Sequence, residues 1–395
     1  MTDYKAIVTE YGSPLYAYSK NVIIKNISLL KNSLDFGRSS FFYAMKANSN
    51  ISILHIIRQQ GFGVDCVSIG EMKTALKCDF SPDRIRFTPS FVNHEEIEFA
   101  INKKIQISLD NLSLLGWISN HHPDFKVGIR INPSVMAGAY VKTSVGHAKA
   151  KFGIGVEHLD EILKFADDGN VKINGLHIHS GSDILEASQF MQAVEVLLQV
   201  APKFKNLEYI DLGSGFKVPY YPGDKQTDLV DLGHAIKSRF TAFCSVYGKD
   251  LNLIFEPGKI VISEAGKFLV TVTGVKTNGG VTFAGVDSGF NHLIRPMFYG
   301  AYHHISNISN PEGPVKMYDI VGDICETDTF ASSREINEIR VGDILCFDNA
   351  GAYCYSMASP YNSRPRPAEI LIDENGNDRL IRRRETLDDI WNLQV

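Results

Sequence analysis

Residues 41–67 read FFYAMKANSNISILHIIRQQGFGVDCV, and they contain the alternation that runs through most of the chain. The first part, Phe41–Met45, is short, apolar and rich in aromatic residues, which is typical of a buried strand. Ile51–Gln60 then carries apolar residues near helical spacing, and a second short apolar run follows at Val64–Val67. The stretch therefore predicts a strand, a helix and a second strand in succession.

The same alternation extends outward over about residues 22–265, with further amphipathic stretches at His94–Asn102 and Ala187–Val200. Eight strands that alternate with helices match a TIM-like (β/α)8 barrel in number and length. We therefore expect residues 22–265 to form such an α/β barrel. Besides the two runs above, its strand candidates are Ile85–Phe87, Ile105–Leu109, Val127–Ile131, Ile173–His177, Glu208–Leu212 and Asn252–Phe255.

The pattern changes after Gly266, where β-rich runs follow one another across turns with few helical segments between them. We expect residues 266–395, together with residues 1–21, to form a second and mostly antiparallel β domain. Glu385–Leu393 is predicted to be a short final helix. The strand candidates are Phe268–Val275, Thr282–Val286, Val315–Val321, Asp343–Phe347 and Glu369–Ile372.

Composition narrows the class of protein. The 395 residues are 44% hydrophobic and 22% charged, with a net charge of -5, so neither the charge nor its sign favours nucleic acid as a partner. No apolar run approaches the roughly 18 residues that span a bilayer, and the opening MTDYKAIVTEYGS lacks the pattern of a secretory signal. Six cysteines without CxxC spacing favour reduced thiols. We expect a cytoplasmic enzyme without a membrane segment.

Polar residues follow six of the predicted barrel strands, at the ends where barrel enzymes carry their chemistry. Five of the six places have ionisable side chains directly after β-rich runs. This convergence predicts an active site at that end of the barrel. The residues are Lys46, Asp65, Arg130, His179, the run Gly213-Ser214-Gly215, and the run Glu256-Pro257-Gly258-Lys259.

Each of these residues also has a simpler interpretation. Lys46 could be a solvated loop lysine, although a lysine at the mouth of a barrel is also where a Schiff base forms. Gly213-Ser214-Gly215 could be only a tight turn, but its position fits a phosphate held by backbone N–H groups. Glu256 could be a helix cap or a surface charge; opposite a pyridine nitrogen it would keep that nitrogen protonated.

His177 and His179 share one face of a strand, a spacing that metal sites also use. A metal would need further ligands at neighbouring strand ends, and Asp65 and Glu256 are the only evident candidates. Because so few further ligands are present, we expect no metal. His179 instead suits a ring stacked on a flat aromatic cofactor.

Taken in order, the motifs resemble the alanine-racemase-fold pyridoxal-phosphate decarboxylases of group IV, and among them the diaminopimelate decarboxylases. The similarity runs from about residue 12 to the end of the chain. It rests on the runs Tyr43–Asn48, Val64–Ser68, Lys151–Ile154, His177–Ser182, Glu256–Lys259, Asn291–Tyr299, Cys325–Asp328, Gly351–Tyr353, Ser356–Asn362 and Arg384–Trp391.

The resemblance implies a cofactor, pyridoxal 5′-phosphate, in the barrel. Lys46 would hold it as a Schiff base, His179 would stack on its ring, and Glu256 would pair with the ring nitrogen. Asp65 and Arg130 are further cofactor-binding candidates at the strand ends. The phosphate would be held by Ser182, Gly213, Ser214, Gly215, Gly258 and Tyr353.

The resemblance also implies decarboxylation of an amino acid, with meso-diaminopimelate to L-lysine as the first expectation. Arg295 and Tyr299 would bind the distal carboxylate, and Glu326 the distal ammonium. Lys259 stands where the family usually has an arginine; it and Tyr353 are further candidates for substrate binding. Cys325 and Glu326 would reach the active site of a partner subunit, so a homodimer with shared sites is implied. Lys46 or Cys325 would donate the proton to the α-carbon.

Four alternatives remain open. A sister decarboxylase would act on a D-diamino acid, a carboxylated polyamine or a siderophore intermediate. A racemase of the same fold would place arginine at the pyridine nitrogen, and Glu256 argues against it. A non-catalytic cofactor carrier would be a single barrel, which the β domain argues against. The last alternative is a metal-dependent barrel hydrolase.

Overall fold

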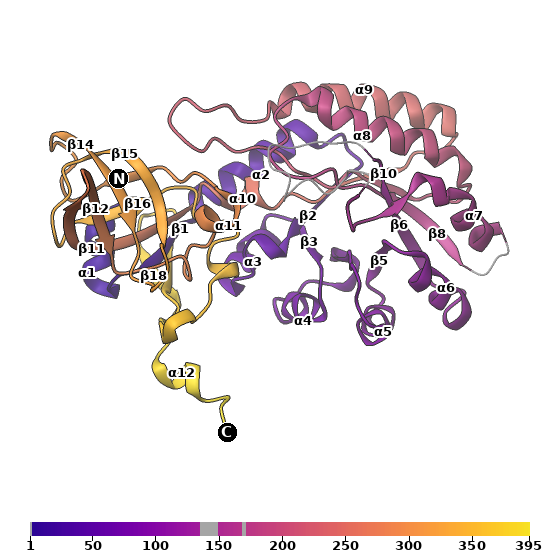
Figure 1. Cartoon of the computed structure of the whole chain (residues 1–395). Coiled ribbons are helices and arrows are strands. Elements are labelled where there is room, and N and C mark those ends of the chain that lie inside the picture. Colours follow the sequence, from indigo (N-terminus) through magenta and orange to yellow (C-terminus); the bar gives the residue numbers. More distant parts are fainter. Residues whose placement is uncertain (1, 135–148, 168–170) are drawn as a thin grey trace. The chain divides into compact units, whose positions relative to one another are not determined.

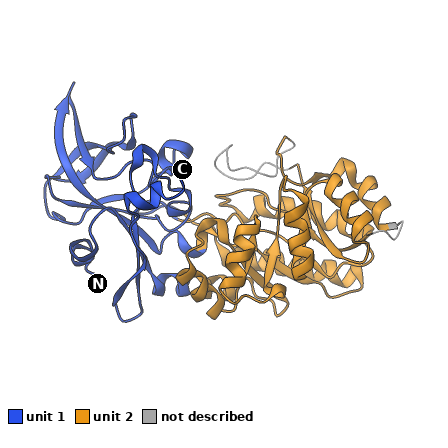
Figure 2. Ribbon diagram, turned by 90° about the horizontal axis from the view of Figure 1, so that it is seen from below, with its two compact units in different colours: residues 1–25, 219–224, 261–395 blue, residues 26–218, 225–260 orange. Residues whose placement is uncertain are grey.

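The computed structural model describes residues 2–134, 149–167 and 171–395 (Figure 1). The chain divides into two compact units (Figure 2). Unit 1 contains residues 1–25, 219–224 and 261–395, and unit 2 contains residues 26–218 and 225–260. Helices alternate with strands in unit 2, whereas unit 1 consists mostly of strands.

Unit 2 holds a closed barrel of eight parallel strands within the described residues. Hydrogen-bonded neighbours follow the order β5-β4-β3-β2-β10-β9-β8-β6, and the pairing of β5 with β6 closes the ring. The predicted barrel is confirmed, and each predicted run overlaps one of its strands. These are β2 (Ser39–Ala44), β3 (Gly63–Cys66), β4 (Ile85–Phe87), β5 (Gln106–Leu109), β6 (Lys126–Asn132), β8 (Lys172–His177), β9 (Tyr209–Asp211) and β10 (Asn252–Phe255); the short β7 (Ile154–Gly155) pairs with β6.

Several barrel helices begin at polar residues placed shortly after the strand ends. Side-chain oxygens of Asn50, Ser68, Asn93 and Asn111 accept hydrogen bonds from backbone N–H groups in the first turns. Such caps satisfy donors that have no partner inside the helix, so they fix where the chain turns from strand to helix. The helices are α3 (Ile51–Gln59), α4 (Ile69–Lys77), α5 (His94–Lys103), α6 (Leu112–His121), α7 (Leu159–Asp167), α8 (Ala187–Val200) and α9 (Leu229–Tyr247), and α2 (Lys20–Leu34) leads into the unit.

The ring of Tyr209 on β9 is large, polar and buried. Glycines on two other strands leave space for it, because a Cβ atom at Gly128 or at Gly175 would overlap Tyr209. The glycines of β6 and β8 are therefore explained by the size of this ring. Arg86 on β4 lies against the same ring, with its guanidinium carbon 4.3 Å from the ring centroid.

Unit 1 is built around a mixed sheet that is mostly antiparallel, as expected. Its strands follow the order β15-β14-β12-β11-β1-β17-β18, with β16 on β11 and β13 on β16; β1–β17 and β12–β14 are the parallel pairs. The strands are β1 (Leu15–Ser19), β11 (Gly266–Asn278), β12 (Val281–Val286), β13 (Ile305–Asn307), β14 (Val315–Val321), β15 (Thr329–Asn337), β16 (Ile344–Phe347), β17 (Ala368–Ile372) and β18 (Asp378–Arg382), and the helices are α1 (Tyr4–Tyr11), α10 (Lys259–Ile262, which starts in unit 2), α11 (Arg295–Tyr299) and α12 (Leu387–Trp391).

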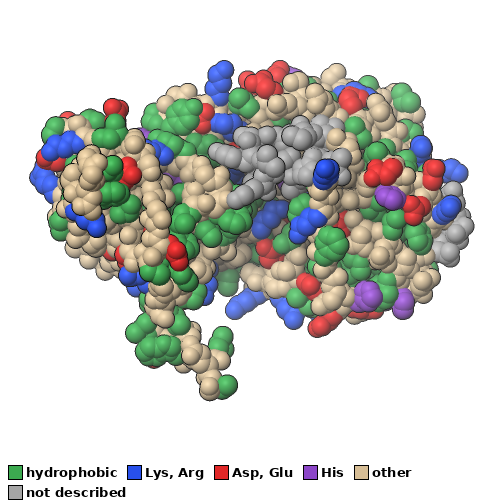
Figure 3. Space-filling model, in the orientation of Figure 1, with side chains coloured by type: hydrophobic (Ala, Val, Ile, Leu, Met, Phe, Trp, Pro, Cys, Tyr) green, Lys and Arg blue, Asp and Glu red, His purple; other side chains and the backbone are tan. Residues whose placement is uncertain are grey.

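Side chains of both charges are interspersed with apolar ones on the face drawn in Figure 3. Within the described ranges, no helix combines the length and the apolar character that a membrane span requires. All six cysteines are free thiols, and all but Cys325 are buried.

Candidate functional site

The loop after β2 carries Lys46, within the short helix Met45–Ala47. Asparagines hold this loop in shape: the Tyr43 hydroxyl donates to the Asn48 carbonyl at 3.1 Å, and the Asn50 N–H donates to Asn48 Oδ1 at 3.0 Å. Asn50 in turn caps α3. Lys46 follows the carboxyl end of β2, the position that the sequence predicts, and its side chain is exposed.

Asp65 and His179 lie close enough to Lys46 for its charge to affect their ionisation. Asp65, buried on β3, accepts a hydrogen bond from Thr88 Oγ1 at 2.5 Å. Burial raises the pKa of Asp65 well above its usual range, repulsion by Glu256 adds to this, and Lys46 opposes it. Burial, followed by the positive charge of Lys46, lowers the pKa of His179 far below its usual value, so this imidazole is neutral.

The loop after β9 forms a cradle of backbone groups. Gly213 and Gly215 have φ of +61° and +115°, values that side chains other than hydrogen rarely allow. A Cβ atom at Gly213 would lie 2.6 Å from the Ile178 carbonyl oxygen and 2.8 Å from His179 Nδ1. The Ser214 N–H donates to His179 Nδ1 at 3.4 Å, so the imidazole nitrogen on that side is an acceptor.

Ser182 and Lys259 meet beside this cradle. The Lys259 ammonium donates to Ser182 Oγ at 2.7 Å and to Asp183 Oδ1 at 2.6 Å, and both charged side chains are buried. A buried ammonium paired with a carboxylate is held firmly, because either charge alone would be costly. Lys259, expected at the substrate, therefore has contacts with the loop that carries Ser182.

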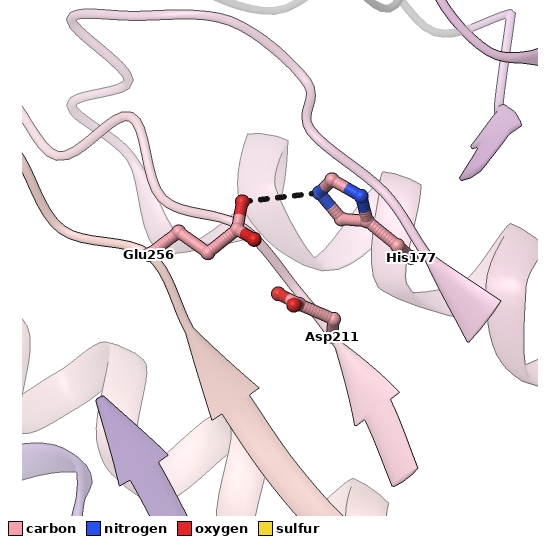
Figure 4. A group of neighbouring side chains, drawn as sticks. All are labelled: His177, Asp211 and Glu256. Atoms are coloured by element: carbon pink, nitrogen blue, oxygen red, sulfur yellow. Dashed lines mark ion pairs between the residues drawn. The ribbon is translucent and has the colours of Figure 1, made fainter. Parts of the chain in front are cut away.

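Glu256 follows β10 and is buried. Its N–H donates to the Gly213 carbonyl at 2.8 Å, which ties it to the cradle. Its side chain approaches His177 and Asp211 (Figure 4): Oε2 lies 3.2 Å from His177 Nε2. Burial lowers the pKa of His177 to about 3, so this histidine is neutral next to the carboxylate. Gly258 leaves the following turn close to β2, since a Cβ atom there would lie 3.1 Å from Ala44 Cβ.

His177, Asp211 and Glu256 are residue types that bind metal ions, and their ligand atoms lie within 4.8 Å of one another. A cation is already present among them. Arg86 Nε lies 3.1 Å from Asp211 Oδ2 and 4.0 Å from Glu256 Oε1. The guanidinium supplies the positive charge that a metal would supply and would repel a divalent ion at the same place. The cluster is therefore better described as a buried ion-pair network than as a metal centre.

Arg130, at the end of β6, is also buried and lies over the Phe152 ring, 4.9 Å from its centroid. Burial lowers the pKa of Arg130, and the charge of Glu256 opposes this. The predicted residues of the barrel thus lie on β3 and β6 or in the segments that follow β2, β8, β9 and β10.

In unit 1, Arg295 begins α11 and is buried. Its Nη1 lies 3.4 Å from His303 Nε2, and its guanidinium carbon is 5.9 Å from the Tyr220 ring centroid. His303 Nδ1 is 2.7 Å from the Asp348 carbonyl oxygen, which can only accept, so Nδ1 carries the proton and Nε2 accepts from Arg295. Burial and the charge of Arg295 lower the pKa of His303 to about 3. Tyr299 ends α11 and is half-buried.

The other predicted residues of unit 1 lie near its surface. Cys325 and Glu326 are exposed; Cys325 Sγ lies 3.4 Å from Asn362 Oδ1, and the Tyr361 hydroxyl donates to Glu326 at 3.0 Å. Tyr353 is half-buried, with a left-handed φ of +59°. Cys325 and Glu326 thus contact two consecutive residues, Asn362 and Tyr361.

Sequence reasoning missed four contributors: Arg86, Asp211, Asp183 and His303. Arg86 stands between two apolar residues of β4, so it faces the opposite side of the strand from both. Asp211 ends the apolar run of β9. A charged residue within an apolar barrel strand could therefore have identified Arg86 and Asp211 from the sequence. The partners of Asp183 and His303 come from distant parts of the chain and had no local signal.

Comparison with known proteins agrees with this geometry. Residues 20–263 match the family model described as "Pyridoxal-dependent decarboxylase, pyridoxal binding domain". The chain is 38% identical to diaminopimelate decarboxylase of Methanothermobacter thermautotrophicus, over 97% of this chain and 92% of that protein, and 35% identical to the Aquifex aeolicus enzyme over the same shares. Its structure is similar to that of diaminopimelate decarboxylase from Helicobacter pylori complexed with L-lysine, with a TM-score of 0.92, 31% identity and 99% of both chains covered.

Proposed function

Because the chain belongs to the pyridoxal-dependent decarboxylases, and among them to the diaminopimelate decarboxylase family, we propose that it converts meso-diaminopimelate into L-lysine and carbon dioxide. One observation carries the proposal. An amine at Lys46, positive-φ glycines at 213 and 215, and a buried carboxylate at Glu256 converge at one end of one barrel. This is the set of groups that a pyridine aldehyde with a phosphate requires.

The residues present fit pyridoxal 5′-phosphate. Glu256 Oε1 is buried and accepts no hydrogen bond from the described residues, so it can accept one from a protonated ring nitrogen. The cradle at Gly213 and Gly215 has no room for a Cβ atom, as expected where backbone N–H groups meet a phosphate. Ser182 and Lys259 add a hydroxyl and a positive charge beside it.

Each barrel residue then has a defined task. When bound, the cofactor supplies an electron-accepting ring that delocalises the electrons of the bond to the departing carboxylate. Lys46 Nζ joins the cofactor covalently, and the neutral His179 ring stacks on it without adding charge. The Glu256 carboxylate holds a proton on the ring nitrogen. Lys46 Nζ and Cys325 Sγ are the two atoms we propose for delivering a proton to the α-carbon.

Asp65, Arg130 and the remaining phosphate ligands complete the proposed cofactor site. Asp65 lies on β3, where the charge of Lys46 affects its ionisation, and Arg130 lies on β6, where the charge of Glu256 affects its ionisation. Ser214 presents its N–H toward His179. Gly258 and Tyr353 would add backbone and hydroxyl contacts to the phosphate, and Tyr353 a contact to the substrate.

The distal end of the substrate is assigned to unit 1. We propose that Arg295, with Tyr299, binds the distal carboxylate, and that Glu326 binds the distal ammonium. The support is that Arg295 is buried beside His303, which accepts from its Nη1 and, being neutral, adds no positive charge next to the guanidinium. We expect Lys259 to act on the phosphate or on the α-carboxylate, where its ammonium offers charge without a bidentate fork.

We further propose a cytoplasmic homodimer in which Cys325 and Glu326 serve the partner's active site. Both residues are exposed, although their chemistry suits a site that excludes water. The test is complementation between K46A and C325A chains, each first assayed alone to establish its loss of activity. Random mixing of two such chains gives back about one quarter of wild-type activity if the sites are shared, because half the dimers then contain one intact site. No recovery after mixing would contradict shared sites.

Substrate identity is tested by carbon dioxide release. We expect release from meso-diaminopimelate and formation of L-lysine, with little release from D-lysine, ornithine or arginine. Turnover of one of those three, with none of meso-diaminopimelate, would assign the chain to a sister decarboxylase.

A further inference from the structure

Arg86 on β4, Asp211 on β9 and Glu256 directly after β10 form a buried cluster of ionisable side chains in the barrel. The guanidinium Nε lies 3.1 Å from Asp211 Oδ2 and 4.0 Å from Glu256 Oε1. These contacts are ion pairs by distance and not aligned hydrogen bonds, because Arg86 Nε and both oxygens have no hydrogen-bond partner among the described residues. The interaction is therefore mainly one of charge.

The cluster is closed off from solvent. Arg86 is 4% exposed, Asp211 0% and Glu256 6%. The Tyr209 ring lies on the guanidinium at 4.3 Å, and the Phe42 ring lies 5.5 Å away. Because water is largely excluded, an interaction between charges at these distances is several times stronger than at the surface.

Asp211 and Glu256 bring two negative charges from adjacent strands into this space. Two buried carboxylates at short range compete to take up a proton, unless a positive charge stabilises both. Burial and the repulsion of Glu256 raise the pKa of Asp211 to about 7, and the charge of Arg86 opposes the rise. His177 itself is neutral, so it cannot supply a positive charge.

Other titratable groups also face Glu256 from the elements packed around it. They include both acidic and basic side chains. They are Asp65 on β3, Arg130 on β6, His177 on β8 and Asp211 on β9, with Lys46 after β2 and Asp110 after β5 acting on these neighbours.

We propose that Arg86 is a positioning residue for the proposed reaction: its sealed guanidinium keeps the Glu256 carboxylate ionised, so that Glu256 can hold the proton on the cofactor's ring nitrogen. Arg86 itself does not reach the reacting atoms. The inference rests on the proposed function. It assigns to Arg86 of β4 a role that it performs through Glu256, without contact to the cofactor.

The test measures protonation of the ring directly. The holoenzyme is prepared with ¹⁵N-labelled pyridoxal phosphate, and the ring-nitrogen signal is followed by solid-state NMR as the pH is raised. In R86M the ring nitrogen should lose its proton at a pH about one to three units lower than in the wild type. The matched control is R84M, which removes the same side chain just before the same strand, where Arg84 contacts the Gly61 carbonyl and the Phe42 ring. It should titrate as the wild type does.

A second variant separates charge from packing. R86M/D211N removes one positive and one negative charge, and the Asn oxygen can still accept the Gly213 N–H that Asp211 Oδ1 now accepts at 2.9 Å. We expect this double variant, and R86K, to keep the ring nitrogen protonated as in the wild type. These two variants decide the matter if R86M alone does not fold.

Three results would overturn the inference. One is an R86M enzyme whose ring nitrogen titrates as in the wild type. Another is a double variant whose ring nitrogen titrates at a lowered pH, since a packing defect would not be repaired by D211N. The third is a wild-type chain that takes up no pyridoxal phosphate, which would overturn the proposed function as well; the first two leave that function intact.

Discussion

Replacing Gly213 by alanine should damage the phosphate cradle and the barrel together. Alanine at a φ of +61° costs about 1 kcal/mol in backbone conformation. The added Cβ would also lie 2.6 Å from the Ile178 oxygen and 2.8 Å from His179 Nδ1, and such overpacking costs about 1–3 kcal/mol. The expected loss of stability is therefore about 2–4 kcal/mol. Because the strain is relieved by moving His179 or the loop, pyridoxal phosphate should bind about 10- to 100-fold more weakly.

Gly37 offers the matched control for this variant. It lies in the same unit with a φ of +83°, and a Cβ atom there would meet nothing within 4 Å. G37A thus carries the backbone cost without the collision. Urea unfolding of the apoprotein and fluorescence titration with pyridoxal phosphate measure the two effects. A G213A protein as stable as G37A, with wild-type affinity for the cofactor, would refute the assignment of this loop.

Three further predictions concern buried ionisable side chains. R295M should raise the KM for meso-diaminopimelate about 100-fold, because a guanidinium–carboxylate contact is lost. The visible spectrum of the bound cofactor should stay unchanged, because the barrel is not altered. Equal KM values for R295M and the wild type would contradict the role of Arg295 in substrate binding. His303 has a folded pKa of about 3 against about 6.5 when unfolded, so its contribution to stability is present above pH 6.5 and lost as the pH falls toward 3. Unfolding of H303Q should take up one proton fewer, so the slope of its unfolding free energy against pH should be smaller by about 1.4 kcal/mol per pH unit. An unchanged slope would show that His303 does not contribute to the pH dependence of stability. D183N removes the carboxylate that pairs with the buried Lys259 ammonium and should lower the unfolding free energy by about 3–5 kcal/mol. D250N removes a carboxylate from a surface pair and should lower it by less than about 1 kcal/mol. Similar losses in both variants would contradict the claim that the Lys259–Asp183 pair contributes more because it is buried.

The barrel was predictable because its signals are local. Each strand is a short apolar run, and the turns that follow several of them carry capping residues such as Asn50 and Ser68. The rule that barrel chemistry lies at strand ends then selected Lys46, Glu256 and the glycine loop without knowledge of any contact. Four of the described strands of unit 1 lie outside the predicted runs. β15 reads TFASSREIN and β18 reads DRLIR, both largely polar, and β13 has only three residues, so their signals are weak. β1 reads LYAYS, an apolar run that was readable and was missed.

The contacts within the site were less predictable, because they join residues far apart in the sequence. Lys259 lies 76 residues from the Asp183 carboxylate that holds it. Arg86 and Asp211 each interrupt or end an apolar strand, but only closure of the barrel brings their charges to 3.1 Å. Sequence pattern gives the ends of strands, whereas the pairing of buried charges depends on the three-dimensional register of the barrel.

The most direct test of the account is to locate the cofactor on the chain. The purified protein is saturated with pyridoxal phosphate, reduced with borohydride, digested and analysed by mass spectrometry, with K46A treated in parallel. We expect the wild type to be yellow and labelled at Lys46, and K46A to be colourless and unlabelled at every lysine. Label on Lys259 or another lysine, or a wild-type chain that takes up no cofactor, would contradict the central claim.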